Sequence, residues 1–162
     1  MTDFEGLLRV LVEGGVEIVL VGGLAARAHG AARSTQDVDV VYARTPENLE
    51  RLARALGPHH PVLRGAPEGL PFRLDVPTLR SGLNFTLTTD LGDIDLLGEI
   101  AGGGTYESLR GSSRELELFG LPVRCIDLDA LIRTKRAAGR PRDLEAIAEL
   151  EALREERDNQ IP

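Results

Sequence analysis

The sequence has 162 residues, of which 42% are hydrophobic, and a formal net charge of -7. The hydrophobic share excludes a disordered chain, and the length favours one domain, residues 1–162, with a core of its own. Aromatic residues amount to 4% and tryptophan is absent, so aliphatic side chains must build that core. The negative charge argues against a protein that coats nucleic acid non-specifically.

The sequence also contains no apolar run of about 20 residues, the length of a membrane span. The acidic N-terminal segment does not resemble a signal peptide. A single cysteine, Cys125, excludes an internal disulfide and is expected to be a small core residue. These features predict a cytoplasmic protein without a membrane partner.

The first half of the chain is expected to alternate between helices and strands. Apolar periodicity, N-cap residues and glycines set the boundaries. In chain order the expected elements are a helix over 3–13, a strand over 16–21, a short helix over 24–29, a strand over 38–42, and a helix that Thr45 caps and that ends at residue 56. The stretch 58–71, rich in proline and glycine, is expected to be a loop.

The second half is expected to hold two hairpins and two helices. The expected strands are 83–88 with 93–97, and 115–119 with 122–126, separated by a flexible connection at 102–104. A helix follows over 128–138, and a last helix begins at Pro141 and frays after residue 153. This order predicts an α+β fold with a mixed sheet of about five or six strands, flanked by helices, and with helices at the C-terminus. It differs from the regular alternation of a Rossmann domain.

The most informative motif is Asp37-Val38-Asp39, which follows a Gly22-Gly23 pair. Alternate residues of a strand point to the same face, so the two carboxylates project side by side and can bind divalent cations. Glycines between a strand and a helix leave backbone N–H groups free to approach phosphate oxygens. The simpler alternatives are a solvated acidic strand face and a tight turn without a ligand. Repulsion between neighbouring carboxylates favours the metal site.

The pattern Gly22-Gly23, Arg33-Ser34-Thr35 and Asp37-Val38-Asp39 resembles the nucleotidyltransferase superfamily, most nearly its AbiEii-like and related minimal bacterial branches. Further elements resemble the family in the same order along most of the chain. They are the segment Gly92-Asp93-Ile94-Asp95-Leu96-Leu97, then Lys135, then Arg142-Asp143. The resemblance implies a nucleotidyltransferase-like fold.

The resemblance also implies a Mg²⁺-dependent enzyme that transfers a nucleoside monophosphate from an NTP to an acceptor hydroxyl. Asp37, Asp39 and Asp95 would be the catalytic carboxylates and the ligands of two Mg²⁺ ions, with Asp95 as a candidate base. Asp93 shares the strand face of Asp95, but the Asp-Leu-Leu context of Asp95 matches the family strand better. The backbone of Gly22 and Gly23 would bind the β- and γ-phosphates alone, because residues 23 and 24 lack the hydroxyl that the family often has.

Three further residues are candidates for nucleotide binding. Lys135, the only lysine in the sequence, lies on an apolar helical face and either extends past the core or points into the cleft to contact the triphosphate. Arg33 either contacts phosphate or is an ordinary solvated side chain. Asp143, in the first turn of the last helix, either follows the helix dipole or orients Lys135 at the site.

Two other functions are compatible with the same motifs. A nucleotide-binding or antitoxin-like regulatory module would use this fold with little or no turnover. A glycosyltransferase would use Asp-x-Asp with a metal, but such domains are generally longer. Related nucleotidyltransferases modify tRNA ends, proteins or small drugs, and several are toxins of toxin–antitoxin pairs. tRNA or another macromolecule is therefore a candidate acceptor, and a cognate protein is a candidate partner.

Overall fold

The structure is a computed structural model that describes residues 1–160. Its main sheet has seven strands in the order β3-β4-β5-β2-β1-β9-β8. These strands are β1 (Ile18–Val21), β2 (Asp37–Tyr42), β3 (Val62–Leu63), β4 (Phe85–Thr89), β5 (Gly92–Leu97), β8 (Ser113–Leu118) and β9 (Leu121–Ile126). Two further strands, β6 (Glu99–Ile100) and β7 (Gly104–Thr105), form a small sheet of their own.

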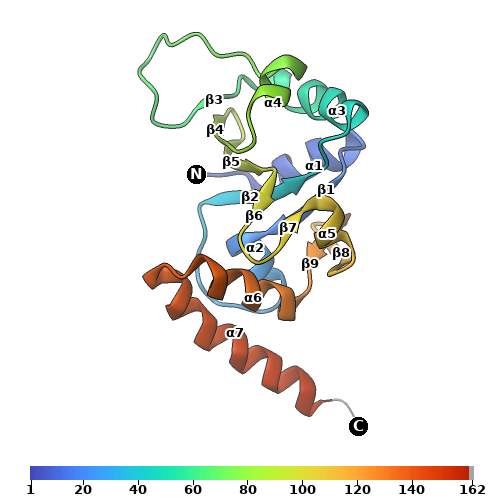
Figure 1. Cartoon of the computed structure of the whole chain (residues 1–162), viewed down its shortest axis with the longest axis vertical. Helices are drawn as coiled ribbons and strands as arrows, with labels where there is room; N and C mark the ends of the chain where they lie inside the picture. Colours follow the sequence, from blue (N-terminus) through green and yellow to red (C-terminus); the bar gives the residue numbers. More distant parts are fainter. Residues whose placement is uncertain (161–162) are drawn as a thin grey trace.

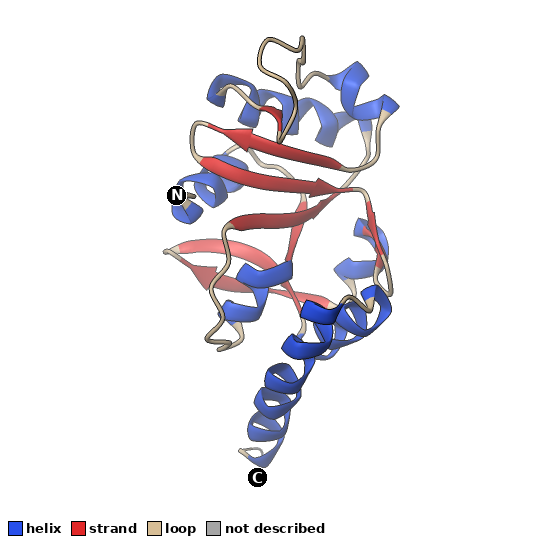
Figure 2. Cartoon of the chain, turned by 90° about the vertical axis from the view of Figure 1, so that its left-hand side faces the viewer, coloured by secondary structure: helices blue, strands red, loops and turns tan. Residues whose placement is uncertain are grey.

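The helices lie around this sheet, and α6 and α7 lie together at the end of the molecule opposite α3 and α4 (Figure 1). They are α1 (Phe4–Glu13), α2 (Gly22–Ala28), α3 (Pro46–Leu56), the short 3-10 helix η1 (Gly57–His59), α4 (Val76–Ser81), α5 (Tyr106–Arg110), α6 (Leu128–Ala138) and α7 (Pro141–Asn159). Figure 2 shows the strands stacked one above another, with α7 extending away from them. No helix within residues 1–160 is long and apolar enough to cross a membrane.

The sheet is mixed, as the sequence predicts. β2 pairs antiparallel with β1 and parallel with β5, and β1 pairs parallel with β9, whereas the remaining neighbours are antiparallel. The sheet has seven strands rather than five or six because a two-residue strand, β3, forms within the loop predicted over 58–71. It pairs with β4 at the edge of the sheet.

Aliphatic side chains fill the core, as the composition requires. All four residues of β1 are buried, which explains why this strand lacks the polar alternation of a half-exposed strand. On α1, Leu7, Leu8 and Leu11 are fully buried along one helical face. Cys125 lies among these core residues, as predicted, and burial raises the pKa of its thiol to about 12.

The differences from the expected elements concern short segments and helix ends. α4, α5, β6 and β7 were not expected, because segments of two to six residues are too short for a periodic pattern. α2 begins at Gly22 rather than at residue 24. α7 continues to Asn159 instead of fraying after residue 153, and within this extension Arg154 and Arg157 each form an ion pair of 3.5 Å with Asp129 on α6.

Candidate active site

The glycine pair forms the sharp passage from β1 into α2. Gly22 has φ +70°, a left-handed conformation that glycine adopts without strain. A Cβ atom added at Gly22 would lie only 2.1 Å from Oδ2 of Asp39, and one added at Gly23 would lie 2.7 Å from Oγ1 of Thr35. Both glycines therefore allow the backbone to approach the acidic strand and the preceding loop closely.

The carboxylates converge because β2 and β5 are parallel neighbours in a fixed register. Asp37 lies opposite Asp93, and Asp39 lies opposite Asp95. The intervening residues on β2 and β5 are fully buried, so Asp37, Asp39, Asp93 and Asp95 share the other face of the sheet and form an acidic face. Asp37, Asp39 and Asp95 each offer an oxygen within 4.8 Å of the others. Among residues 1–160, this three-carboxylate cluster includes Asp95 and not Asp93.

Burial and mutual repulsion dominate the electrostatics of the cluster. Burial, and then the charges of Asp37 and Asp95, raise the pKa of Asp39 to about 8. Burial and the neighbouring Asp95 carboxylate also raise the pKa of Asp37, against the opposing effect of Arg64. A hard divalent cation with oxygen ligands would reverse both shifts, so the donor set fits Mg²⁺.

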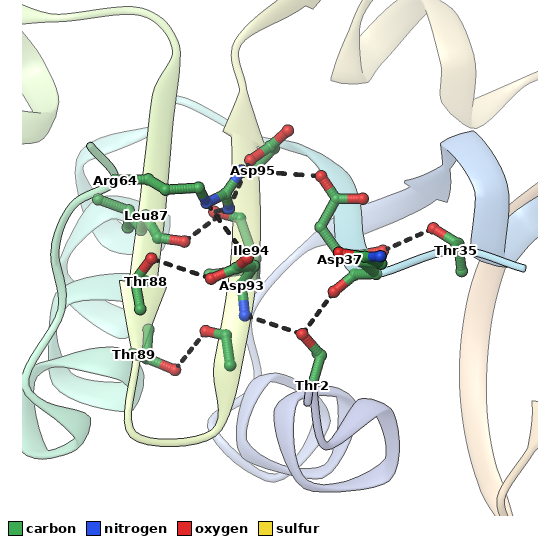
Figure 3. Close-up of polar contacts among 12 residues, drawn as sticks. Thr2, Thr35, Asp37, Arg64, Leu87, Thr88, Thr89, Asp93, Ile94 and Asp95 are labelled. Carbon is green, nitrogen blue, oxygen red and sulfur yellow. Dashed lines mark hydrogen bonds and ion pairs between the residues drawn. The ribbon is translucent and has the colours of Figure 1, made fainter. Parts of the chain in front are cut away.

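Thr2 forms hydrogen bonds that link the start of β2 to the start of β5 (Figure 3). The backbone N–H of Asp93 donates to Oγ1 of Thr2 at 3.1 Å, and the same hydroxyl donates to the carbonyl oxygen of Gln36 at 2.5 Å. Gln36 directly precedes β2 and Asp93 is the second residue of β5. The two hydrogen bonds therefore support the register on which the cluster depends.

Two basic side chains line the cleft together with the acidic strands: Lys135 on α6 and Arg140 at the N-cap of α7. Lys135 lies on α6 with 19% of its side chain exposed, and its Nζ is 3.4 Å from Oδ1 of Asp143. The Asp143 side chain is fully buried and accepts from the backbone N–H, Nε and Nη2 of Arg140. Arg140 rather than Arg142 thus binds this carboxylate. Asp143 holds Lys135 and Arg140 together at one edge of the cleft.

Replacing Asp143 with asparagine is expected to destabilise the protein by about 2 kcal/mol at pH 7, because charge-assisted hydrogen bonds to a buried carboxylate are lost. Burial alone would raise the pKa of Asp143, but the hydrogen bond from Arg140 and the charge of Lys135 outweigh burial and lower that pKa. A lowered pKa stabilises the fold above the ordinary aspartate value of about 4 and ceases to do so as the pH falls through the folded value.

Urea unfolding at pH 7 and at about pH 3 measures this effect, since the ordinary aspartate pKa lies between the two. The difference between the Asp143→Asn variant and the original protein should shrink at the lower pH. Asp158→Asn, which alters an exposed ion pair with Arg157, is the control and should change stability little. An Asp143→Asn effect of equal size at both pH values would contradict this assignment.

Together these segments enclose a cleft of about 460 Å³. Its lining includes every residue proposed from the sequence as part of the site: Gly22, Gly23, Arg33, Asp37, Asp39, Asp95, Lys135 and Asp143. Arg33 reaches the cleft but also forms an ion pair of 3.1 Å with Glu145 on α7, and both side chains are at least half exposed. The loop before β2 is thereby linked to α7 across the cleft.

No protein-family model matches the sequence, and no curated protein matches it significantly. The fold, in contrast, is similar to solved structures over nearly the whole chain. LnuA, a lincosamide antibiotic adenylyltransferase solved with lincomycin bound, is 13% identical with a TM-score of 0.61 over 94% of this chain and 98% of LnuA. The chain has the nucleotidyltransferase fold.

Two further structures share the nucleotidyltransferase fold. ANT(2'')-Ia, solved in complex with adenylyl-2''-tobramycin, is 19% identical with a TM-score of 0.52 over 98% of this chain and 96% of its own. TM1012 of Thermotoga maritima, a proposed nucleotidyltransferase, is 17% identical with a TM-score of 0.52 over 99% of this chain and 97% of its own. At these identities the similarity shows the fold alone.

The structure adds three residues to the site to which the sequence alone assigns no role: Thr35, Arg64 and Arg140. Thr35 brings a hydroxyl next to Gly23 from another segment, although residues 23 and 24 carry none. Arg140 binds Asp143 from the N-cap position of α7. Arg64 approaches three aspartates of the acidic face from the edge of the sheet (Figure 3). Only Thr35 left a sequence signal, as part of the Arg33-Ser34-Thr35 motif.

Proposed function

We propose that this protein is a Mg²⁺-dependent nucleotidyltransferase that transfers a nucleoside monophosphate from an NTP to an acceptor hydroxyl. One observation carries the proposal: oxygens of Asp37, Asp39 and Asp95 lie within 4.8 Å of one another, in a cleft that a glycine turn and Lys135 also line. Burial raises the pKa values of Asp37 and Asp39, and the charges of neighbouring carboxylates raise them further, so a divalent cation would be favoured at this cluster.

In this proposal the acceptor oxygen attacks the α-phosphorus, the bond to the bridging oxygen breaks, and pyrophosphate leaves with the bonding electrons. Asp95 accepts the proton of the acceptor hydroxyl. The backbone N–H groups of Gly22 and Gly23 and the hydroxyl of Thr35 bind the terminal phosphates. Mg²⁺ held by the three aspartates would neutralise the triphosphate and polarise the α-phosphate.

The basic side chains of the cleft bind the triphosphate in this proposal. Lys135, directed by Asp143, and Arg33 contact the triphosphate and the leaving pyrophosphate. Asp143 is ionised at neutral pH despite its burial, because Arg140 and Lys135 lower its pKa, and its carboxylate lies 3.4 Å from the amino group of Lys135. Catalysis then consists mainly of positioning and charge neutralisation.

The acceptor class is the open part of the proposal. LnuA and ANT(2'')-Ia carry antibiotics in their structures, and each matches this chain over at least 96% of its own length. A small hydroxyl compound is therefore a candidate acceptor beside tRNA and other macromolecules. Membership of the AbiEii-like branch, a toxin–antitoxin role and a cognate partner protein stay predictions.

Incubation with each α-labelled NTP, Mg²⁺ and either bulk tRNA or a panel of hydroxylated small molecules tests the proposal. Label transfer is expected to require Mg²⁺ and to disappear in Asp37→Ala. Asp90→Ala is the control, because Asp90 is exposed on the turn between β4 and β5. Tight NTP binding without transfer to any acceptor would instead support the nucleotide-binding module.

A further inference from the structure

Arg64 is anchored next to the acidic face by the backbone of the edge strands. It follows β3 directly, and its backbone N–H donates to the carbonyl oxygen of Thr86 at 2.9 Å. Its Nη2 donates to the carbonyl oxygen of Leu87 at 2.7 Å. With 28% of its side chain exposed, Arg64 is held in place rather than free in solvent.

From this anchor the guanidinium reaches three of the four aspartates on the acidic face (Figure 3). Nη2 lies 3.0 Å from Oδ1 of Asp95, Nε lies 3.5 Å from Oδ2 of Asp93, and Nη1 lies 3.8 Å from Oδ2 of Asp37. Two of these, Asp37 and Asp95, belong to the three-carboxylate cluster. Arg64 therefore shares two carboxylates with the proposed Mg²⁺ site.

The guanidinium could affect a divalent cation in two opposite ways. It could raise the affinity by holding the carboxylates in place, or lower it by contributing positive charge. The parallel register of β2 and β5 already sets the backbone positions of the carboxylates, with Asp37 opposite Asp93 and Asp39 opposite Asp95. What Arg64 adds beyond that register is mainly its charge, at short range and partly shielded from water.

We propose that Arg64 is a built-in countercation that competes with a divalent metal for Asp37 and Asp95, so that the free protein binds the metal weakly. This inference rests on the proposed function, because it assumes that the cluster binds a metal. Arg64 stabilises the metal-free fold by offsetting repulsion among the aspartates. Firm metal binding then requires a further source of negative charge in the cleft, which the triphosphate of an NTP supplies.

Titration calorimetry with Mn²⁺ and no nucleotide, at constant pH and ionic strength, tests this competition. Arg64→Gln, which removes the charge, is expected to bind Mn²⁺ about tenfold more tightly than the original protein. Arg64→Lys, which keeps the charge without the planar fork, should stay within about threefold. Arg73→Gln, an exposed arginine in the same connection between β3 and α4, is the matched control and should not change the affinity.

Thermal unfolding supplies a second measurement. In EDTA, Arg64→Gln is expected to melt at a lower temperature than the original protein, and Mn²⁺ should raise its melting temperature at lower concentrations. If Arg64→Gln does not fold in EDTA, Mn²⁺ is expected to restore its folding, and a failure to do so overturns the inference.

The failures of the two proposals are distinguishable. Equal or weaker Mn²⁺ binding by Arg64→Gln, while the original protein binds Mn²⁺, overturns the role of Arg64 and leaves the proposed metal site intact. Absence of Mn²⁺ binding in every variant at millimolar concentrations overturns the metal site and, with it, this inference.

Discussion

Asp39→Asn is expected to reduce nucleotidyl transfer by roughly a thousandfold, since a lost metal ligand removes several kcal/mol of transition-state stabilisation. The same substitution is expected to make the metal-free protein more stable. Asp39 is crowded by Asp37 and Asp95, and its pKa is raised by burial and by their charges. Asparagine mimics the protonated acid, so the variant avoids the cost of ionising this side chain.

The stabilisation should depend on pH in a defined direction. Because the folded-state pKa of Asp39 is raised to about 8, the folded protein binds this proton more tightly than the unfolded chain does. Stability from this group is therefore complete below the ordinary aspartate pKa of about 4 and is lost as the pH rises toward 8. Asp39→Asn should match the original protein near pH 4 and exceed it by up to about 5 kcal/mol at pH 8, because the folded-state pKa is about 8 rather than about 4 and each pKa unit is worth about 1.4 kcal/mol.

Urea unfolding in EDTA at the two pH values, together with the transfer assay, measures both effects. Asp90→Asn removes an exposed carboxylate from the neighbouring turn and should alter neither property appreciably. A variant that lost activity and also lost stability at pH 8 would show that Asp39 supports the fold rather than a metal.

Gly22→Ala is expected to lower activity by about a hundredfold, the usual scale for displacing a reacting group by an ångström. The new Cβ would lie 2.1 Å from Oδ2 of Asp39, so the carboxylate must move. The backbone of Gly22, at φ +70°, would also be strained by about 1 kcal/mol in an alanine variant.

Gly15→Ala separates the two causes, because Gly15 has a similar φ of +68° and its added Cβ would meet only Cδ of Arg51, at 4.0 Å. Both variants should lose about 1 kcal/mol of stability. Only Gly22→Ala should lose transfer activity and Mn²⁺ binding. Equal activity in the two variants would show that the close approach of Gly22 to Asp39 has no catalytic importance.

The sequence is informative about this site where the chemistry lies in short local patterns. Alternation in Asp37-Val38-Asp39 predicts two carboxylates on one strand face, and Gly22-Gly23 predicts a sharp turn before a helix. The choice between Asp93 and Asp95 cannot follow from alternation, because both share one face. The deciding factor is which neighbour each meets: Asp95 lies opposite Asp39, whereas Asp93 lies opposite Asp37 and accepts a hydrogen bond from Thr88.

Arg64 shows what local patterns do not contain. It lies in a stretch rich in proline and glycine, beside a strand of two residues, and 31 positions before Asp95. Its contacts depend on β3 pairing with β4 at the edge of the sheet, which is a property of the assembled fold. The expected strand number was too low for the same reason.

The location of Lys135 has a practical consequence. It is the only lysine in the sequence, it lines the cleft, and its amino group is ion-paired with Asp143. Apart from the N-terminal amine, an acylating or imine-forming reagent thus has a single primary amine to modify. The rate of that labelling offers a direct chemical reporter of whether a ligand occupies the cleft.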